Sequence, residues 1–323
     1  MRSKNCFPVL CLLAFCAAII LLSRPVFGAE EQDPQMAEYE ALAKQYDSLR
    51  GDAGKQMSPQ ELAAACDELI DDFNELIQSA SSNPSVKSKS QMLLSYVYGF
   101  RGMEPESRQA YSDYLDTLES WQGTDYAVMV VRRAGGRMLN KEADPTQALV
   151  YYELLLEKYP NHESRADALY HAGLACLYLD CYAEAAEKFG AAFQADPQGY
   201  WAPWCLRKKA FALELNATAG TGHADALAVL DELEERFPNP HWGGYACYRR
   251  GYILQIDGKD LEAVAEYQKG MEQYPTSPYS KWSRRRAQKV QEQLEQQMLD
   301  EMAREGRKDE LHHAEVSDGE PRT

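Results

Sequence analysis

The sequence predicts an all-α fold, an α-α superhelix made of stacked helical hairpins. Two observations carry this prediction: a spacing of small, aromatic and proline residues that recurs along the chain, and capping and charged segments at the two ends of the recurring region. With 45% hydrophobic and 26% charged residues the composition is globular, which excludes disorder along the whole length.

Residues 1–28 are predicted to be a signal peptide. Arg2 and Lys4 precede an unbroken apolar run over residues 9–22, and a helix of that length reaches only ~21 Å of the ~30 Å hydrocarbon core. Val26 and Gly28 stand at the −3 and −1 positions of a signal-peptidase site, which predicts cleavage after Gly28. The expected location is therefore outside the inner membrane, in the periplasm or at the outer membrane.

Two other fates of this segment stay open. Left uncleaved, the apolar run would be a tilted anchor in the inner membrane. The second is lipidation at Cys16, although Phe15 stands where lipoprotein signals have a small residue and more apolar sequence follows.

The charge of the chain restricts its partners. Without the three basic residues of the first 28, the sequence has 31 basic and 50 acidic residues, a net charge of about −19. Such a surface repels phosphates, so nucleic acid is not an expected partner. Membrane contact is expected only through an uncleaved signal segment.

Residues 29–57 are predicted to be a linker and an amphipathic helix over 35–49. Ser58, Pro59 and Glu61 then form a capping-box sequence that opens a helix to about Ala80. We expect these two helices to pair as a degenerate first hairpin.

The array proper is predicted over residues 58–279, where four copies of one spacing occur. Each copy has a small residue, a large apolar residue four positions on, a further small or apolar residue at seven, and proline at twelve. The copies are Ala148-Tyr152-Leu155-Pro160, Ala185-Phe189-Ala192-Pro197, Ala226-Leu230-Leu233-Pro238 and Ala263-Tyr267-Gly270-Pro275. An incomplete earlier copy has Ala110 and Tyr114 but no proline.

A glycine stands twelve positions before three of these alanines, at Gly136, Gly173 and Gly251. Positions i, i+4 and i+7 share one helix face, so each copy is an amphipathic helix. The small residues let two antiparallel helices approach closely, the aromatic residue fills the space beyond the crossing, and proline ends the helix. Because a single hairpin leaves one apolar face bare, neighbouring hairpins are expected to stack.

These offsets resemble the tetratricopeptide repeat, which has a small residue at position 8, Ala at 20, an aromatic residue at 24 and Pro at 32. On that frame the repeats are residues 91–124, 129–162, 166–199, 203–240 and 244–277, the first incomplete. The fourth has an insertion of about four residues near 216–222. Arg132, Lys209 and Arg250 fall where the frame has half-buried apolar side chains, so the register of their helices stays open by one residue.

The Tyr-Pro punctuation, as at Tyr159-Pro160 and Tyr274-Pro275, resembles cell-envelope members of the family: the Tol–Pal-associated coordinator and the lipoprotein subunit of the β-barrel assembly machinery. The resemblance implies an exported, non-catalytic scaffold of the bacterial cell envelope that binds a protein or peptide segment in a concave groove. The groove residues it implies are Arg133, Arg137, Tyr170, Leu174, Trp204, Arg207, Phe211, Tyr245, Tyr248 and Tyr252. Tyr, Trp and Arg are enriched in binding hot spots, and the arginines favour an acidic partner. For Trp204 and Tyr245, packing within the array stays open.

Residues 280–306 are predicted to form a C-terminal capping helix, since a charged helix gives the array a polar outer surface. Residues 307–323 are polar and expected to be disordered. As an alternative, the helix acts as a coiled-coil-like handle, and the chain is then a structural, oligomerising envelope component. The oligomeric state stays open.

No catalytic, cofactor or metal site is expected. The chain lacks nucleophile-elbow, phosphate-loop and zinc-protease sequences, and its histidines are scattered; His171 is interpreted as structural packing. Five cysteines remain after cleavage, namely Cys66, Cys176, Cys181, Cys205 and Cys247. A bridge from Cys181 to Cys176 or Cys205 stays open beside the interpretation that the thiols fill apolar packing.

Overall fold

The computed structural model describes residues 33–217 and 223–317, and within these ranges the chain is helical and has no strand. It divides into two compact units, residues 1–171 and 172–323, with the boundary inside helix α8 (Arg165–Tyr178). The predicted signal peptide and part of the predicted insertion lie outside the described residues.

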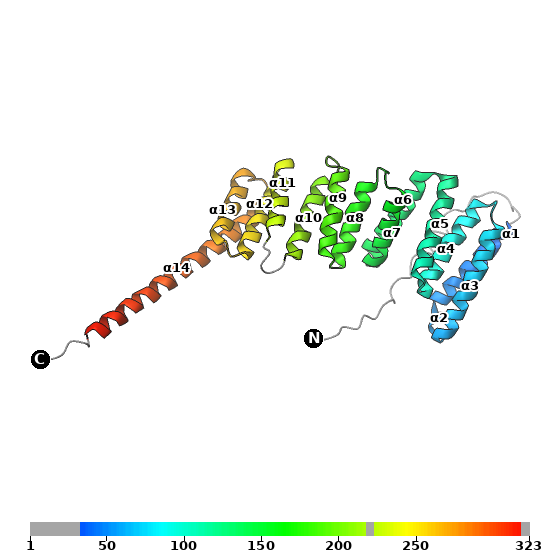
Figure 1. The fold of residues 1–323 in the computed structure, drawn as a ribbon, viewed down its shortest axis with the longest axis horizontal. Coiled ribbons are helices and arrows are strands. Elements are labelled where there is room, and N and C mark those ends of the chain that lie inside the picture. Colours follow the sequence, from blue (N-terminus) through cyan, green and yellow to red (C-terminus); the bar gives the residue numbers. More distant parts are fainter. Residues whose placement is uncertain (1–32, 218–222, 318–323) are drawn as a thin grey trace. The chain divides into compact units, whose positions relative to one another are not determined.

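The first unit is a series of helices, most of which pack on the next one in the chain (Figure 1). In chain order they are α1 (Pro34–Arg50), α2 (Asp52–Lys55), α3 (Pro59–Ser79), α4 (Pro84–Arg101), α5 (Glu104–Gln122), α6 (Thr124–Arg137), the π-helical turn η2 (Met138–Glu142), α7 (Pro145–Lys158) and the first part of α8. The core of its N-terminal part joins α1, α3 and α4 around the fully buried Phe73, Leu76 and Val86.

The capping box predicted at the start of α3 is present. The Ser58 backbone N–H donates to Glu61 Oε2 at 2.8 Å, and the Glu61 N–H donates to Ser58 Oγ at 3.2 Å. Helix α4 begins at Pro84, with Asn83 as its N-cap, so the predicted first boundary at residue 91 falls inside a helix. The repeat frame could not locate this start, because it is set by the cap and proline rather than by the repeating spacing.

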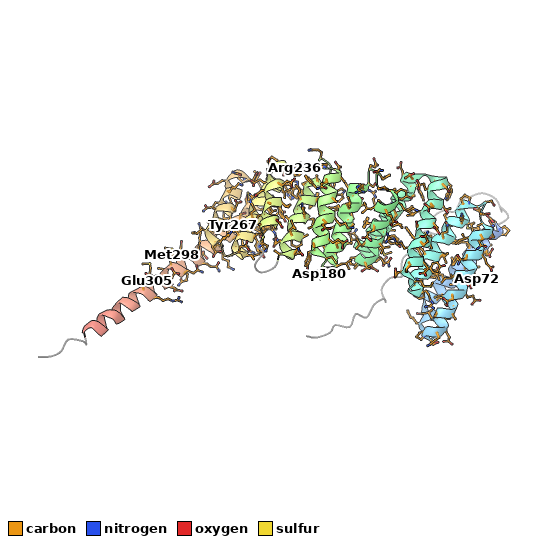
Figure 2. The ribbon with its side chains drawn as sticks, viewed as in Figure 1. Asp72, Asp180, Arg236, Tyr267, Met298 and Glu305 are labelled. Carbon is orange, nitrogen blue, oxygen red and sulfur yellow. The ribbon has the colours of Figure 1, made fainter. Side chains whose placement is uncertain are left out.

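The second unit continues the same arrangement, each helix packing on its neighbour. After the remainder of α8, its helices are α9 (Tyr182–Ala195), α10 (Ala202–Asn216), α11 (Ala224–Arg236), α12 (Pro240–Ile256), α13 (Asp260–Gln273) and α14 (Ser280–Ser317). Figure 2 shows Tyr267 within the group of α12 and α13, and Met298 and Glu305 on the part of α14 that extends past it.

The glycine–aromatic packing predicted for the hairpins is present in the second unit. A Cβ placed on Gly173 would lie 2.9 Å from the Phe189 ring, and one on Gly251 would lie 2.6 Å from the Tyr267 ring. Phe189 and Tyr267 are both fully buried. Only glycine therefore allows the two helices of each hairpin to come this close.

In the first unit the contact is shifted by one residue from the prediction. A Cβ on Gly135 would lie 2.9 Å from the Tyr152 ring, whereas one on Gly136 would lie 3.6 Å from its hydroxyl oxygen. Gly135, rather than the predicted Gly136, is thus the crossing residue. The π-helical turn η2 lies between Gly135 and α7, and its wider turn takes up the extra residue of separation.

The recurring prolines stand just after their helices. Helices α7, α9, α11 and α13 end two residues before proline, and the intervening C-cap residue has left helical geometry, for example with φ −125° and ψ 57° at Tyr159. Proline disfavours helical backbone in the residue before it, which explains the common end point. In the fourth repeat, Ala210 and Leu230 occupy the positions of glycine and aromatic residue, and both are buried.

Arg250 is buried, with 5% of its surface exposed, and this settles the register of α12. Its guanidinium pairs with Glu234 and, at 3.0 Å, with Glu266. Lys269 Nζ lies 2.9 Å from Glu234, and the Tyr274 hydroxyl donates to the same carboxylate at 3.1 Å. The arginine occupies a semi-buried position of the frame because α11 and α13 supply its counter-charges.

Helix α14 runs to Ser317, past the predicted end at 306. Residues 307–317, which the sequence predicted to be disordered, are therefore helical. A polar composition does not prevent a helix, and the one glycine in this stretch, Gly306, costs only about 1 kcal/mol, while the next glycine is Gly319. No helix of the described part of the chain is long and apolar enough to span a membrane.

Candidate functional site

The second unit has a row of aromatic and arginine side chains along α10, α12 and the start of α14, which we call the aromatic–arginine face. Its members are Trp204, Arg207, Phe211, Tyr245, Tyr248, Arg249, Tyr252, Tyr279, Trp282 and Arg286. Six of these were predicted from the repeat frame.

Arg207 lies between two rings at one end of this face. Its guanidinium carbon is 5.3 Å from the centroid of the Trp204 ring and 4.8 Å from that of Tyr245. Trp204 in turn packs edge-to-face on Trp242 at 4.8 Å. Burial raises the pKa of Tyr245, partly opposed by the charges of Arg249 and Arg207, so its hydroxyl stays neutral.

Arg249 is held in place by the chain itself. Its Nε and Nη2 donate to the two oxygens of Glu214 at 2.9 and 2.8 Å, a bidentate pair. The same guanidinium lies 5.4 Å from the Phe211 ring and 4.8 Å from the Tyr252 ring. Burial raises the pKa of Glu214, and Arg249 opposes that rise.

The other end of the face is aromatic. Tyr248 and Tyr279 stack with centroids 6.0 Å apart, and Trp282 contacts both at 5.8 and 5.5 Å. Trp282 is 51% exposed. Arg286 lies 4.8 Å from the Tyr252 ring and donates to Gln255.

Three consecutive cations stand on α10, of which only Arg207 belongs to the aromatic–arginine face. Lys208 lines the pocket described next, and Lys209 lies against Gly190 of α9. Within the described ranges, no carboxylate lies at ion-pair distance from Arg207, Lys208 or Lys209. All three are half-buried. Burial lowers the pKa of Lys208, and the charge of Arg207 adds to this effect.

A pocket of about 180 Å³ opens beside Lys208. Its other lining residues are Leu174, Leu177, Tyr178, Asp180, Tyr182, Phe211 and Leu215. Phe211 thus belongs to both the pocket and the aromatic–arginine face. The predicted residue Leu174 lies here rather than on the face.

The remaining three predicted residues belong to the first unit. Arg133 is exposed on α6, and Arg137 is half-buried at the end of the same helix. Tyr170 is buried, with its ring 5.3 Å from that of His171. The predicted set therefore divides between the units, three residues in the first and seven in the second.

The frame missed Arg249, Tyr279, Trp282 and Arg286. Arg249 lies one position off the assumed inner stripe, and the other three follow the last complete repeat. The acid-free stretch from Gln273 to Gln291 was the available signal for the residues of α14.

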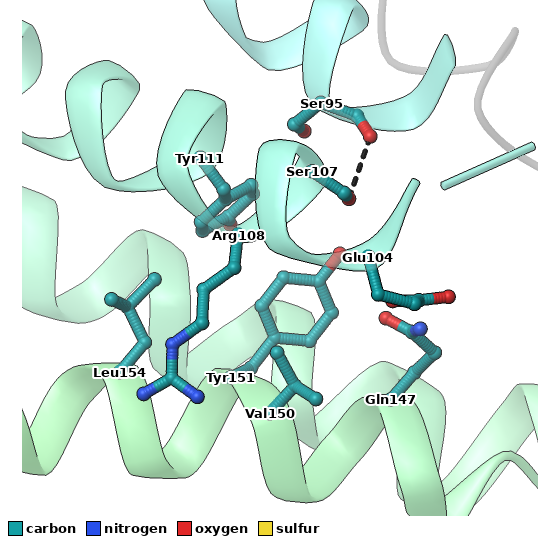
Figure 3. Close-up of a pocket in the computed structure, with 9 residues that line it drawn as sticks. All are labelled: Ser95, Glu104, Ser107, Arg108, Tyr111, Gln147, Val150, Tyr151 and Leu154. Atoms are coloured by element: carbon teal, nitrogen blue, oxygen red, sulfur yellow. Dashed lines mark hydrogen bonds between the residues drawn. The ribbon is translucent and has the colours of Figure 1, made fainter. Parts of the chain in front are cut away.

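A second opening, in the first unit, leaves little space. It measures about 20 Å³, room for a single water. Figure 3 shows the Tyr151 ring filling the space between Val150 and Ser107, with Arg108 extended beside Leu154. It is a helix junction and not a ligand site.

No cluster of metal-ligating side chains occurs in the part of the chain that the structure describes. Cys181 is an exposed free thiol, so neither disulfide considered for it is formed, and Cys66, Cys205 and Cys247 are buried. Burial raises the pKa of Cys205 to about 12, which removes its thiolate character.

No family model and no curated protein matches the chain. Among solved structures, PilW, a widely conserved type IV pilus biogenesis factor, is similar at 12% identity over 76% of this chain and 96% of its own, with a TM-score of 0.41. The C-terminal part of a TPR repeat-containing protein from Cytophaga hutchinsonii matches at 18% identity over 76% and 94%, with a TM-score of 0.41. A tetratricopeptide repeat protein from Parabacteroides merdae matches at 16% identity over 80% and 93%, with a TM-score of 0.35.

The chain's own packing defines its class, an α-helical repeat protein made of consecutively packed hairpins. The glycine–aromatic crossings, the buried alanines and the proline-terminated second helices are those of tetratricopeptide-type repeats.

Proposed function

We propose that this chain is an exported, non-catalytic scaffold of the bacterial cell envelope that binds an acidic protein or peptide segment. The observation that carries the proposal is the placement of Arg207, held between two aromatic rings and left without a carboxylate of the described chain.

The charge of the partner follows from this placement. A guanidinium stacked on rings keeps the edge of its planar fork available for a carboxylate. Lys208 adds a second half-buried cation, which lines the neighbouring pocket with Phe211. Leaving such charges without a counter-ion is unfavourable, so an acidic segment gains from pairing with them.

The partner should also carry apolar side chains. Trp282 is exposed, and it contacts the half-buried Tyr248 and Tyr279. The pocket lined by Leu174 and Phe211 has room for one side chain. Aromatic and arginine residues together are typical of binding hot spots. The proposed partner therefore alternates acidic and apolar residues.

The remaining predicted residues are assigned on burial. Arg133 and Arg137 are proposed as further contacts, as the repeat frame places them. Tyr245, 7% exposed, is proposed to support the face from within. Tyr170, 5% exposed, is proposed to pack within its own unit, and neither is proposed to contact a partner.

The test uses a displayed library of random peptides selected on the purified protein. We expect the selected peptides to be rich in Asp and Glu interleaved with apolar residues. Arg207→Ala should weaken their binding at least about tenfold. The control Arg236→Ala removes another ring-stacked arginine, which lies on α11 over the Phe193 ring of α9, and it should leave binding unchanged. Selected peptides without acidic excess, or unchanged binding by Arg207→Ala, would contradict the proposal.

Export is tested separately. Mass spectrometry of the protein from its native cell should show an N-terminus at Ala29 and recovery in the envelope fraction. A retained Met1 would leave the anchored alternative, and a lipid on Cys16 the lipoprotein one.

A further inference from the structure

Helix α14 is longer than the surface it covers. Its first turns bury Ser283, Ala287 and Val290 against α13 and α12. From Glu295 to Glu305 every side chain is exposed, including Met298 and Leu299 at 62% and 60%. The helix therefore extends well beyond its own unit's core (Figure 1).

The two halves of this helix carry opposite charge. The packed half has five basic residues and no acidic one: Lys281, Arg284, Arg285, Arg286 and Lys289. The extending part, residues 292–317, has eight acidic residues and three basic ones: Glu292, Glu295, Asp300, Glu301, Glu305, Asp309, Glu310 and Glu315, with Arg304, Arg307 and Lys308. Within the described residues none of the packed-half cations pairs with a carboxylate.

A continuous helix cannot fold back to neutralise itself, because it rises ~1.5 Å per residue in one direction. The acidic half can meet a basic half only on another molecule. We infer that the exposed face of α14 binds a second copy of this chain, and that the two α14 helices lie antiparallel.

One register satisfies both charge and shape. With Lys289 opposite Glu292 of the other copy, Lys281 falls opposite Asp300, and Trp282 falls opposite Leu299. No like charges meet in this register. At ~100° per residue, these positions share the face of α14 opposite to the buried Ala287, and all are exposed.

The pairing is isologous, so each contact occurs twice about a two-fold axis. Single exposed ion pairs contribute little and are screened by salt. The association is therefore weak and salt-sensitive, with the Trp282–Leu299 contact as its apolar part. Its four charged residues, Lys281, Lys289, Glu292 and Asp300, lie outside the aromatic–arginine face, whereas Trp282 belongs to it. The pairing would therefore cover Trp282, and the charge reversals below test the pairing without changing that face.

Charge reversal tests the pairing by sedimentation of the natural protein at low salt. We expect a dimer that Lys281→Glu/Lys289→Glu weakens at least about tenfold, and that Glu292→Lys/Asp300→Lys weakens equally. Combining all four substitutions should restore it. A natural protein that stays monomeric at every concentration, or a combined variant no better than its parents, overturns the pairing.

Cross-linking tests the register itself. In a Cys181→Ser background, Arg285→Cys and Gln296→Cys fall opposite each other between copies, while within one chain they are ~16 Å apart. Mild oxidation should give a covalent dimer. The matched control, Arg285→Cys alone, should give no covalent dimer. In this register the two introduced cysteines of the dimer are also ~16 Å apart along the helix. Equal yields from both would refute the antiparallel register.

Discussion

Gly135 and Gly136 are neighbours in α6 that should respond in opposite ways to the same substitution. A Cβ at Gly135 would lie 2.9 Å from the Tyr152 ring, well inside the ~3.5–4.0 Å at which carbon atoms attract. Overpacking of this kind costs about 1–3 kcal/mol, and the helix gains about 0.5–1 kcal/mol from losing a glycine. Gly135→Ala should therefore lower the free energy of unfolding, by up to about 2.5 kcal/mol.

Gly136→Ala is the matched control. Its Cβ would lie 3.6 Å from the Tyr152 hydroxyl oxygen, an ordinary contact, so only the gain of about 0.5–1 kcal/mol remains. Urea unfolding followed by far-UV circular dichroism measures both, compared by midpoint because repeat arrays can unfold in stages. If both variants shift alike, or Gly136→Ala is the less stable, the crossing assigned to Gly135 is wrong.

Three further predictions concern the second unit. Arg250→Met should lower the free energy of unfolding by about 3 kcal/mol, since it leaves the half-buried Glu234 and Glu266 short of a partner. No change in the urea midpoint would show that Lys269 alone neutralises Glu234. For Glu234, burial raises the pKa, but the hydrogen bond from Lys269 and the charge of Arg250 more than offset this and lower it from 4.5. A lowered carboxyl pKa contributes stability that is present above the unfolded value and lost as pH falls through the folded one. Stability should thus fall more steeply below pH 4.5 in the natural protein than in Glu234→Gln, and parallel acid titrations would refute this. Arg207→Ala should lower the free energy of unfolding, measured in urea, by no more than about 1 kcal/mol. A larger loss would mean that weaker peptide binding by this variant reflects impaired folding.

The sequence predicted the hairpins well because their determinants are local. Proline after α9 and α13, buried Ala185 and Ala263, and the aromatic residues at the crossings are all readable as spacings. The crossing at Gly135 was not, since the π-helical turn that shifts it has no spacing signature. The prediction of disorder for residues 307–317 was wrong because it rested on their polar composition, which an exposed helix also has.

The face was only partly predictable, for a different reason. The repeat frame identifies which side chains share a helix stripe, and it found Trp204 and Arg207 in this way. It could not show that Arg249 is committed to Glu214 while Arg207 has no such partner, because both facts depend on neighbouring helices. Nor could it anticipate that Arg250 is buried among carboxylates from α11 and α13.

The crossing positions also constrain one another in size. Gly173 stands with Phe189, whereas the fourth repeat has the larger Ala210 with the smaller Leu230. The two sets fill comparable space, so a bulkier residue on one helix is accommodated by a slimmer one on the other. Substitutions at these sites should therefore be tolerated in pairs. A larger residue at Gly173 destabilises the third repeat on its own, but it is accommodated when Phe189 is replaced by a smaller residue.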